Sequence, residues 1–114
     1  MRIKHEYMSA KNDEGDDISV HLFEFHFRTK WIFGRIWDAN PNIADLLHWH
    51  DNEGHLHTFT TVPYEDPDFC QVVRYFRDTK GVTEVGIWSR EKRIGNRKPS
   101  EWIVVDFNKI DNGK

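Results

Sequence analysis

The alternation of apolar and polar positions along the chain predicts a protein built mainly of strands. The strongest strand covers residues 18–27, where three phenylalanines share one face and aliphatic residues occupy the other. Apolar residues on both faces predict a central strand that is covered on two sides. Residues 31–37 repeat the pattern, and the short link 28–30 predicts a hairpin. Further strands are expected at residues 3–8, 55–62, 82–89 and 102–107.

One helix is predicted with good start and stop signals, over residues 66–79. Asp66 can cap the helix and Pro67 suits its first turn, while Gly81 follows its end. Four apolar residues at helical spacing are expected to face the sheet, and they are Phe69, Val72, Val73 and Phe76.

Residues 40–50 have two interpretations. As a helix, they begin with the capping pair Asn40 and Pro41, and apolar residues then fall on one helical face. As a strand, they mix Asp45 with Leu47 and Trp49 on one face. A short helix is preferred here, and the strand stays open as the alternative.

These elements predict a single α+β domain spanning residues 1–114. We expect a mostly antiparallel sheet of about five to six strands, with one or two helices packed on one face. Apolar residues make up 38% of the chain, which is enough for a core and argues against general disorder.

Charge and cysteine content narrow the class of protein further. The formal net charge of -3 does not mark the whole surface as a nucleic-acid binder. The single cysteine, Cys70, excludes an internal disulfide and fits a reducing compartment. No segment approaches the roughly 18 to 20 apolar residues that span a bilayer. We therefore expect a cytoplasmic protein without a membrane partner.

Four histidines fall within ten residues, and they are the candidate metal ligands His48, His50, His55 and His57. Residues two apart on a strand face the same way, so His55 and His57 are expected to point together. A plain hairpin would place all four on one face. Asp51 and Gly54 instead have the spacing of a type I turn with a glycine bulge, which sends the two pairs to opposite faces.

The segment His55-Leu56-His57 resembles the His-hydrophobic-His motif of the HUH endonucleases, which are replication initiators and relaxases. The resemblance covers residues 54–85 and implies a divalent metal held by the two histidines, with a helical tyrosine attacking a DNA phosphate. Tyr75 is the tyrosine that matches this role. The chain departs from the motif at Asp78, where the family has a lysine three residues after the tyrosine.

A basic loop is predicted between the last two expected strands. Residues 90–98 hold five basic side chains against one acidic one, and the basic ones are Arg90, Lys92, Arg93, Arg97 and Lys98. On a hairpin tip these side chains could contact phosphates or an acidic protein surface. No aromatic residue lies among them, which argues against stacking on single-stranded bases.

The function that these observations favour is a small non-enzymatic interaction module that binds a macromolecular partner. Five tryptophans and strands with apolar residues on both faces provide surface for a protein partner or a second copy in a homodimer. The basic loop adds nucleic acid as another partner class. No cofactor is expected in this interpretation. The alternative is a metal-dependent nucleic-acid enzyme that uses His55 and His57 to hold a divalent metal such as zinc or manganese.

Overall fold

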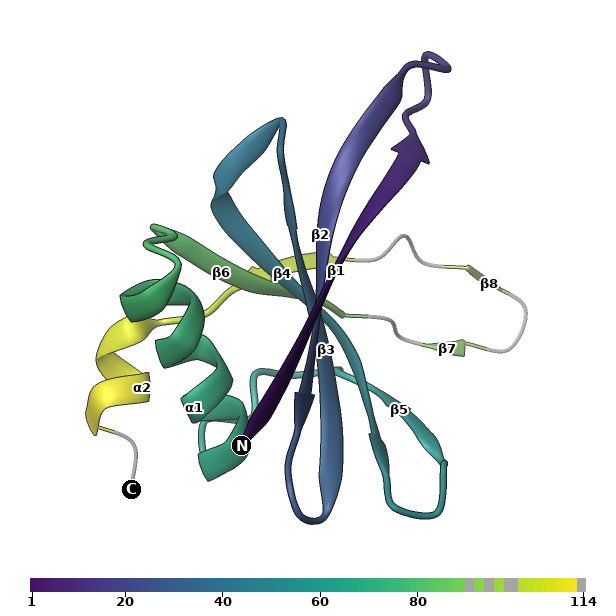
Figure 1. Cartoon of the computed structure of the whole chain (residues 1–114). Helices are drawn as coiled ribbons and strands as arrows, with labels where there is room; N and C mark the ends of the chain where they lie inside the picture. The colour runs from purple at the N-terminus through teal and green to yellow at the C-terminus, as the bar shows by residue number, and fades with distance from the viewer. Residues whose placement is uncertain (90–91, 94–95, 98–100, 113–114) are drawn as a thin grey trace.

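The structure of the chain, a computed structural model, describes residues 1–89, 92–93, 96–97 and 101–112 (Figure 1). The described strands are β1 (Arg2–Lys11), β2 (Asp17–His26), β3 (Lys30–Trp37), β4 (Asn40–Asp51), β5 (Leu56–Thr58), β6 (Glu84–Ser89), β7 (Lys92–Arg93), β8 (Asn96–Arg97) and β9 (Glu101–Val104). The described helices are α1 (Pro67–Arg74), the π-helical turn η1 (Tyr75–Thr79) and α2 (Phe107–Asn112).

Most strands of the described chain join one open sheet with the order β1-β2-β3-β4-β6-β9, in which β5 also pairs with β4. Within the part of the chain that the structure describes, strands β7 and β8 pair only with each other. Within the main sheet β4 and β6 run parallel, and the other neighbours run antiparallel. The α+β class with a mostly antiparallel sheet is therefore confirmed. Among the described residues, no helix is long and apolar enough to cross a membrane.

The first four strands form a continuous meander because each link suits a tight turn. The side chain of Asn12 accepts hydrogen bonds from the backbone N–H groups of Glu14 and Asp16, and Gly15 adopts a positive φ of 82°. At the next link, the N–H of Phe27 donates to the carbonyl of Lys30, which closes the predicted hairpin.

The preferred helix at residues 40–50 is wrong, because this segment is strand β4. Strand β4 pairs with β3 along one edge, and with β5 and β6 along the other. This position buries Ala44 and Leu46 completely. Tertiary pairing on both edges therefore outweighs the local helix signal from Asn40 and Pro41.

Helix α1 begins as predicted. The side chain of Asp66 accepts a hydrogen bond from the N–H of Asp68, and Pro67 is the first helical residue. All four stripe residues, Phe69, Val72, Val73 and Phe76, are fully buried. The α-helix ends at Arg74 and continues as a π-helical turn, in which the N–H of Lys80 donates to the carbonyl of Tyr75.

The core forms where α1 and η1 contact the sheet. The ring of Phe76 packs edge-on against the rings of Phe23 and Phe25, each with centroids 5.3 Å apart. Gly34 makes room for this contact, since a Cβ there would lie 2.8 Å from Leu46 Cδ2 and 3.0 Å from the Phe76 ring.

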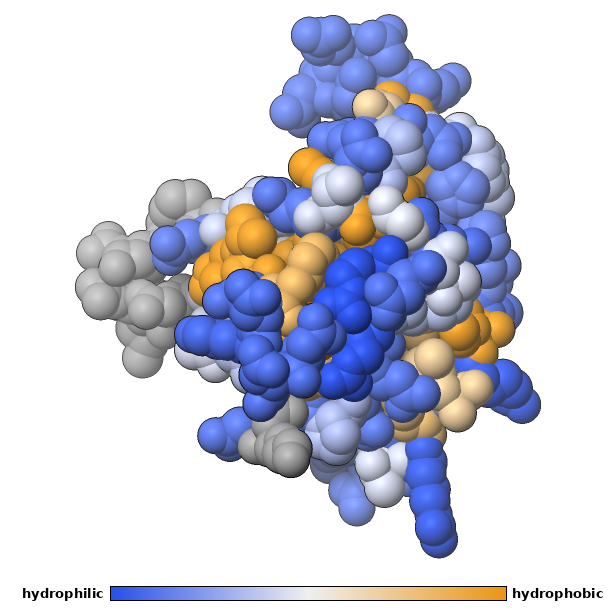
Figure 2. Space-filling model, turned by 90° about the vertical axis from the view of Figure 1, so that its left-hand side faces the viewer, coloured by the Kyte–Doolittle hydropathy of each residue, from blue (hydrophilic) through white to orange (hydrophobic). Residues whose placement is uncertain are grey.

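The surface seen in Figure 2 is mostly hydrophilic, with hydrophobic residues gathered in smaller areas.

Two other expected strands end well before their predicted ends. The strand at residues 55–62 is reduced to β5, because the chain leaves the ladder after Thr58, before it reaches Pro63. The strand at residues 102–107 ends at Val104, and Phe107 begins α2 instead. Ile110 of α2 is fully buried, and its carbonyl accepts a hydrogen bond from Arg74 of α1. Burial of Ile110 thus favours a short helix that the sequence pattern did not predict.

Candidate functional site

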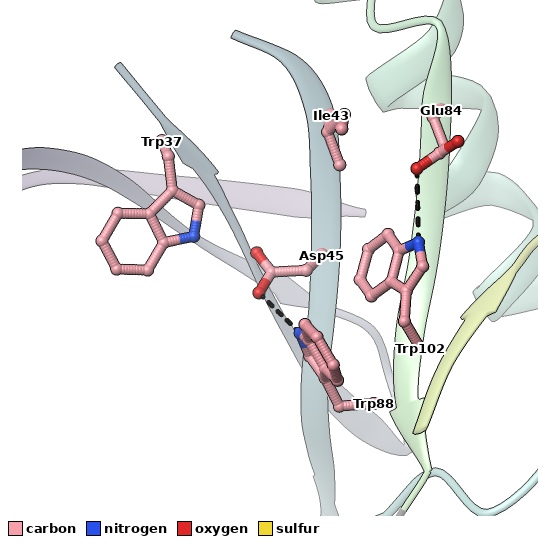
Figure 3. Close-up of a pocket in the computed structure, with 6 residues that line it drawn as sticks. All are labelled: Trp37, Ile43, Asp45, Glu84, Trp88 and Trp102. Atoms are coloured by element: carbon pink, nitrogen blue, oxygen red, sulfur yellow. Dashed lines mark hydrogen bonds between the residues drawn. The ribbon is translucent and has the colours of Figure 1, made fainter. Parts of the chain in front are cut away.

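Four neighbouring strands place three tryptophans around a cavity of about 360 Å³ on one face of the sheet (Figure 3). The register explains the convergence. Asp45 of β4 pairs with Gly86 of β6, and Trp88 lies two residues beyond Gly86 on the same face. Trp88 in turn pairs with Trp102 of β9. The residues that line this tryptophan pocket are Trp37, Ile43, Asp45, Glu84, Trp88 and Trp102.

Asp45 is a buried acidic residue in this pocket, with only 4% of its surface exposed. Its Oδ2 accepts hydrogen bonds from Arg35 Nε at 2.8 Å and from Trp88 Nε1 at 3.3 Å. Its Oδ1 is also buried and has no hydrogen-bond partner among the described residues. Burial raises the pKa of the Asp45 carboxyl above its ordinary 3.8, although the Arg35 guanidinium and the hydrogen bonds act in the opposite direction.

The walls of the tryptophan pocket are held in place by polar contacts. The indole N–H of Trp88 donates to Asp45, and that of Trp102 donates to Glu84 Oε2 at 3.2 Å. The Arg35 guanidinium lies over the ring of Trp37, 4.8 Å from its centroid. Each ring therefore has one polar or cationic contact that favours its orientation in the absence of a ligand.

Histidines and aromatic rings form a stripe along the same face of the sheet. His26 stacks on Trp31 at 4.0 Å, and Trp31 lies 4.8 Å from His50. Phe33 lies 4.8 Å from His48. Burial and the neighbouring His50 lower the pKa of His48 below its ordinary 6.5. The predicted metal ligands His48 and His50 thus pack against aromatic rings of β3.

The turn before β5 has the glycine-bulge register, with Gly54 at a positive φ of 83° and Trp49 paired with His57. His57 stacks on Trp49 at 4.0 Å, on the face opposite to His48 and His50. The four histidines therefore do not converge.

Asp51 is the acidic residue that both His55 and His57 contact. His55 Nδ1 and His57 Nε2 each lie 3.3 Å from Asp51 Oδ2. Hydrogen bonds from the N–H groups of His55 and Glu53, together with His57, overcome the effect of burial and lower the pKa of Asp51 to about 2. Among the described residues, no group of three or more His, Cys, Asp or Glu is arranged to hold a metal ion.

Tyr75, the candidate catalytic tyrosine, packs partly into the core. Its ring lies edge-on to Phe25 at 5.3 Å and to Phe23 at 6.2 Å. Lys80 Nζ lies 5.9 Å from the centroid of the same ring. These contacts indicate that Tyr75 is a packing residue at the start of η1.

The predicted basic loop lies mostly outside the described residues, and this includes Arg90 and Lys98. Lys92 and Arg93 form β7 and pair with Asn96 and Arg97 of β8. The backbone of these four residues thus forms a small antiparallel ribbon.

A polar network that the sequence analysis did not identify lies near the outer edge of the sheet. His5 Nε2 lies 2.8 Å from His21 Nδ1, and His21 Nε2 lies 2.6 Å from Asp38 Oδ1. The hydroxyl of Tyr7 donates to Asp38 Oδ2. Burial, His21 and Lys80 lower the pKa of His5 below its ordinary 6.5. The alternation of His5 and Tyr7 in β1 indicated a shared face, but only the pairing of Tyr7 with His21 brings the network together.

No family model, curated protein or solved structure matches this chain.

The tryptophan pocket was not predicted from the sequence, because the tryptophans were counted without being grouped. One signal was present, namely the single acidic residue Asp45 between apolar positions of a segment with a strand interpretation. A charged residue at a position that a strand would bury is informative, because such residues are rarely buried without a specific role or partner.

Proposed function

We propose that this protein is a small non-enzymatic binding module that recognises a macromolecular partner through the face of the sheet carrying the tryptophan pocket. The observation that carries the proposal is the preformed cavity of about 360 Å³ between Trp37, Trp88 and Trp102. Ligand sites in proteins are typically concave and lined by apolar and aromatic side chains with a few placed polar groups. Asp45 and Glu84 supply those polar groups here.

Tryptophan side chains suit this role because each buries a large area while losing few degrees of freedom. Tryptophan is also enriched among the residues that dominate binding energy at interfaces. The polar contacts of the three indoles reduce the ordering that binding would otherwise require. We take both helices to lie against the opposite face, in support of which Phe76 packs on Phe23 and Phe25.

A comparison of two surface variants in the native host tests this function. Trp88 is 38% exposed in the pocket, whereas Leu56 is 65% exposed next to the turn before β5. We expect a macromolecule that co-purifies with the wild type and with Leu56→Ala to be lost with Trp88→Ala. The reciprocal experiment, with the identified partner as bait and the purified variants as prey, confirms direct binding. Equal recovery of the partner with all three proteins would show that the pocket is not part of the interface.

A second copy of the chain is another occupant of this surface, and a homodimer was expected from the sequence. Light scattering at high protein concentration distinguishes the cases. A dimer that Trp88→Ala converts to a monomer makes the second copy the partner, while a dimer that survives the change places that contact elsewhere.

We further propose a cytoplasmic location, in support of which Cys70 is a buried free thiol.

The basic loop is proposed as an additional electrostatic contact with an acidic protein surface or with nucleic acid. The charge reversals Arg93→Glu and Arg97→Glu are expected to weaken partner binding, with the loss largest at low salt. A nucleic-acid partner would show log affinity falling linearly with log salt concentration. Unchanged binding at every salt concentration would exclude the loop.

The competing proposal, a metal-dependent nucleic-acid enzyme, rests on His55 and His57 alone. Elemental analysis of the purified protein and incubation with single-stranded DNA and manganese test it directly. Bound metal together with a cleavage activity that His57→Ala abolishes would favour the enzyme over the binding module.

A further inference from the structure

The lining of the tryptophan pocket has an unusual chemical composition. Three indole rings form its walls, Ile43 adds an aliphatic surface, and the only charged lining residues in the described chain are the carboxylates Asp45 and Glu84. Aromatic faces carry partial negative charge and attract cations positioned over them. Walls and charged groups therefore favour the same kind of ligand, one that is positively charged and partly apolar.

The state of Asp45 provides an independent observation. The carboxyl is buried, and its Oδ1 has no partner among the described residues, which is an energetically costly arrangement for a polar atom. Arg35 compensates for only one of the two nearby carboxylates. Taken together, the side chains of Asp45, Glu84 and Arg35 carry one net negative charge. A cation in the pocket would offset that charge.

The face of Trp37 already shows that an indole of this pocket accepts a cation. The Arg35 guanidinium lies 4.8 Å from its centroid, and the same guanidinium is bonded to Asp45. A combination of indole and carboxylate thus holds a cation within the chain itself. The rings of Trp88 and Trp102, whose centroids lie 5.0 Å apart with a tilt of 53°, add two more aromatic surfaces beside it.

We propose that the tryptophan pocket binds a methylated ammonium group, carried either by a modified lysine of the partner or by a choline-like small molecule. This rests on the proposed function, and it names the chemical group that the binding face recognises. Methyl groups give the cation an apolar surface, whereas an unmodified lysine ammonium is compact and strongly hydrated. The methylated form therefore enters an indole-lined cavity at a lower desolvation cost, and the cation–π attraction is retained.

The five tryptophans provide a direct spectroscopic test, since the indole N–H signals of Trp37, Trp88 and Trp102 report on the pocket. Trp31 and Trp49 lie outside the pocket and serve as internal controls. Isotope-labelled protein is titrated with choline, with short peptides carrying unmodified, dimethylated or trimethylated lysine, and with the neutral carbon analogue of choline. We expect the pocket signals to shift with the methylated cations, and choline to bind about fivefold or more tightly than its neutral analogue.

Three variants separate pocket chemistry from general stability. Trp88→Ala should abolish binding, whereas Trp31→Ala, which removes a tryptophan of similar exposure on the same face, should leave it unchanged. Glu84→Gln keeps an oxygen that can accept from Trp102 but removes the charge. It should weaken choline binding several-fold and leave binding of the neutral analogue unchanged.

The outcomes distinguish this inference from the proposed function. Tighter binding of the methylated peptides identifies a modified protein as the source, and tighter binding of choline identifies a small molecule. Equal binding of choline and its neutral analogue overturns the inference. Pocket indole signals that do not shift with any methylated probe overturn it as well. If Trp88→Ala nevertheless removes the macromolecular partner in that case, the proposed function stands. If the methylated cations bind but partner recovery is the same for all variants, the proposed function fails and the ligand assignment stands.

Discussion

The indole ring of Trp102 lies over the backbone of Gly86, so closely that a Cβ on Gly86 would fall 2.3 Å from Trp102 Cζ2. Gly86 is the partner of Asp45 in the parallel ladder, so it lies below the pocket between β4 and β9. The absence of a side chain at Gly86 allows Trp102 to reach Glu84 and to complete the wall of the pocket.

Substitution of this glycine is expected to disrupt the pocket. Gly86→Ala should displace the Trp102 ring, because overlap at 2.3 Å cannot be relieved without moving the indole. The free energy of unfolding should fall by about 1–3 kcal/mol, which is typical of overpacking. Urea denaturation measures this loss, and a shifted indole N–H signal of Trp102 reports the movement.

A double-mutant cycle identifies the cause of that loss. In a Trp102→Ala background the added methyl group of Gly86→Ala has no indole to displace, so it should cost much less than in the wild type. The same cost in both backgrounds would contradict the role of Gly86 as space for Trp102.

Much of the fold follows from local patterns in the sequence. The helix that begins at Asp66 and Pro67 was predicted because its cap, first turn and apolar stripe agree with one another. Strand β4 was missed because Asn40 and Pro41 imitate a helix start, while the pairing that stabilises the strand involves residues far away in the chain. The stabilising energy of such pairing cannot be inferred from the residues of a short sequence segment.

The candidate site was less accessible to prediction for the same reason. Trp37, Asp45, Trp88 and Trp102 come from four strands, and their meeting depends on the register of three ladders. A slip of one residue would turn any of these side chains to the other face. By contrast, Asp51 and Gly54 specify the turn before β5 locally, so the separation of the histidine pairs followed from the sequence.

The ion pair between Arg35 and Asp45 gives an asymmetric prediction. Arg35→Met leaves a buried carboxylate without its cation, and it should lower the free energy of unfolding by about 3–5 kcal/mol at neutral pH. Asp45→Asn should cost less, because Arg35 is 30% exposed and can turn to water. Denaturant unfolding of both variants measures the difference, and a larger loss for Asp45→Asn would contradict this account.

The same pair gives a pH dependence with a definite sign. The folded protein raises the pKa of Asp45 above 3.8, so it binds this proton more tightly than the unfolded chain does. Through this group alone, stability falls as the pH rises from 3.8 through the folded pKa. Thermal denaturation of Asp45→Asn should lack this contribution, and an identical pH profile in wild type and variant would refute it.

Two histidines are expected to destabilise the protein in mild acid. The folded structure lowers the pKa values of His5 and His48 below 6.5, so the unfolded chain takes up these protons first. Through these two groups alone, stability should be constant above 6.5 and fall as the pH decreases from 6.5 toward the folded pKa values. The variant His5→Gln with His48→Gln should lose less stability between pH 7 and pH 5, as followed by thermal denaturation. A loss as steep as that of the wild type would assign the effect to other groups.

Tyr75 allows the packing and catalytic interpretations to be compared in one residue. Tyr75→Phe retains the ring contacts with Phe25 and Phe23, so the free energy of unfolding should change by less than about 1 kcal/mol. Tyr75→Ala removes those contacts and should cost about 2–4 kcal/mol, the range of a large aromatic truncation at a partly buried site. A nucleophilic tyrosine would show the opposite dependence, since an enzyme loses its activity with the hydroxyl group and not with the ring. If Tyr75→Phe abolishes partner binding or a cleavage activity while stability is unchanged, the hydroxyl group is functional and the packing role of Tyr75 is incomplete.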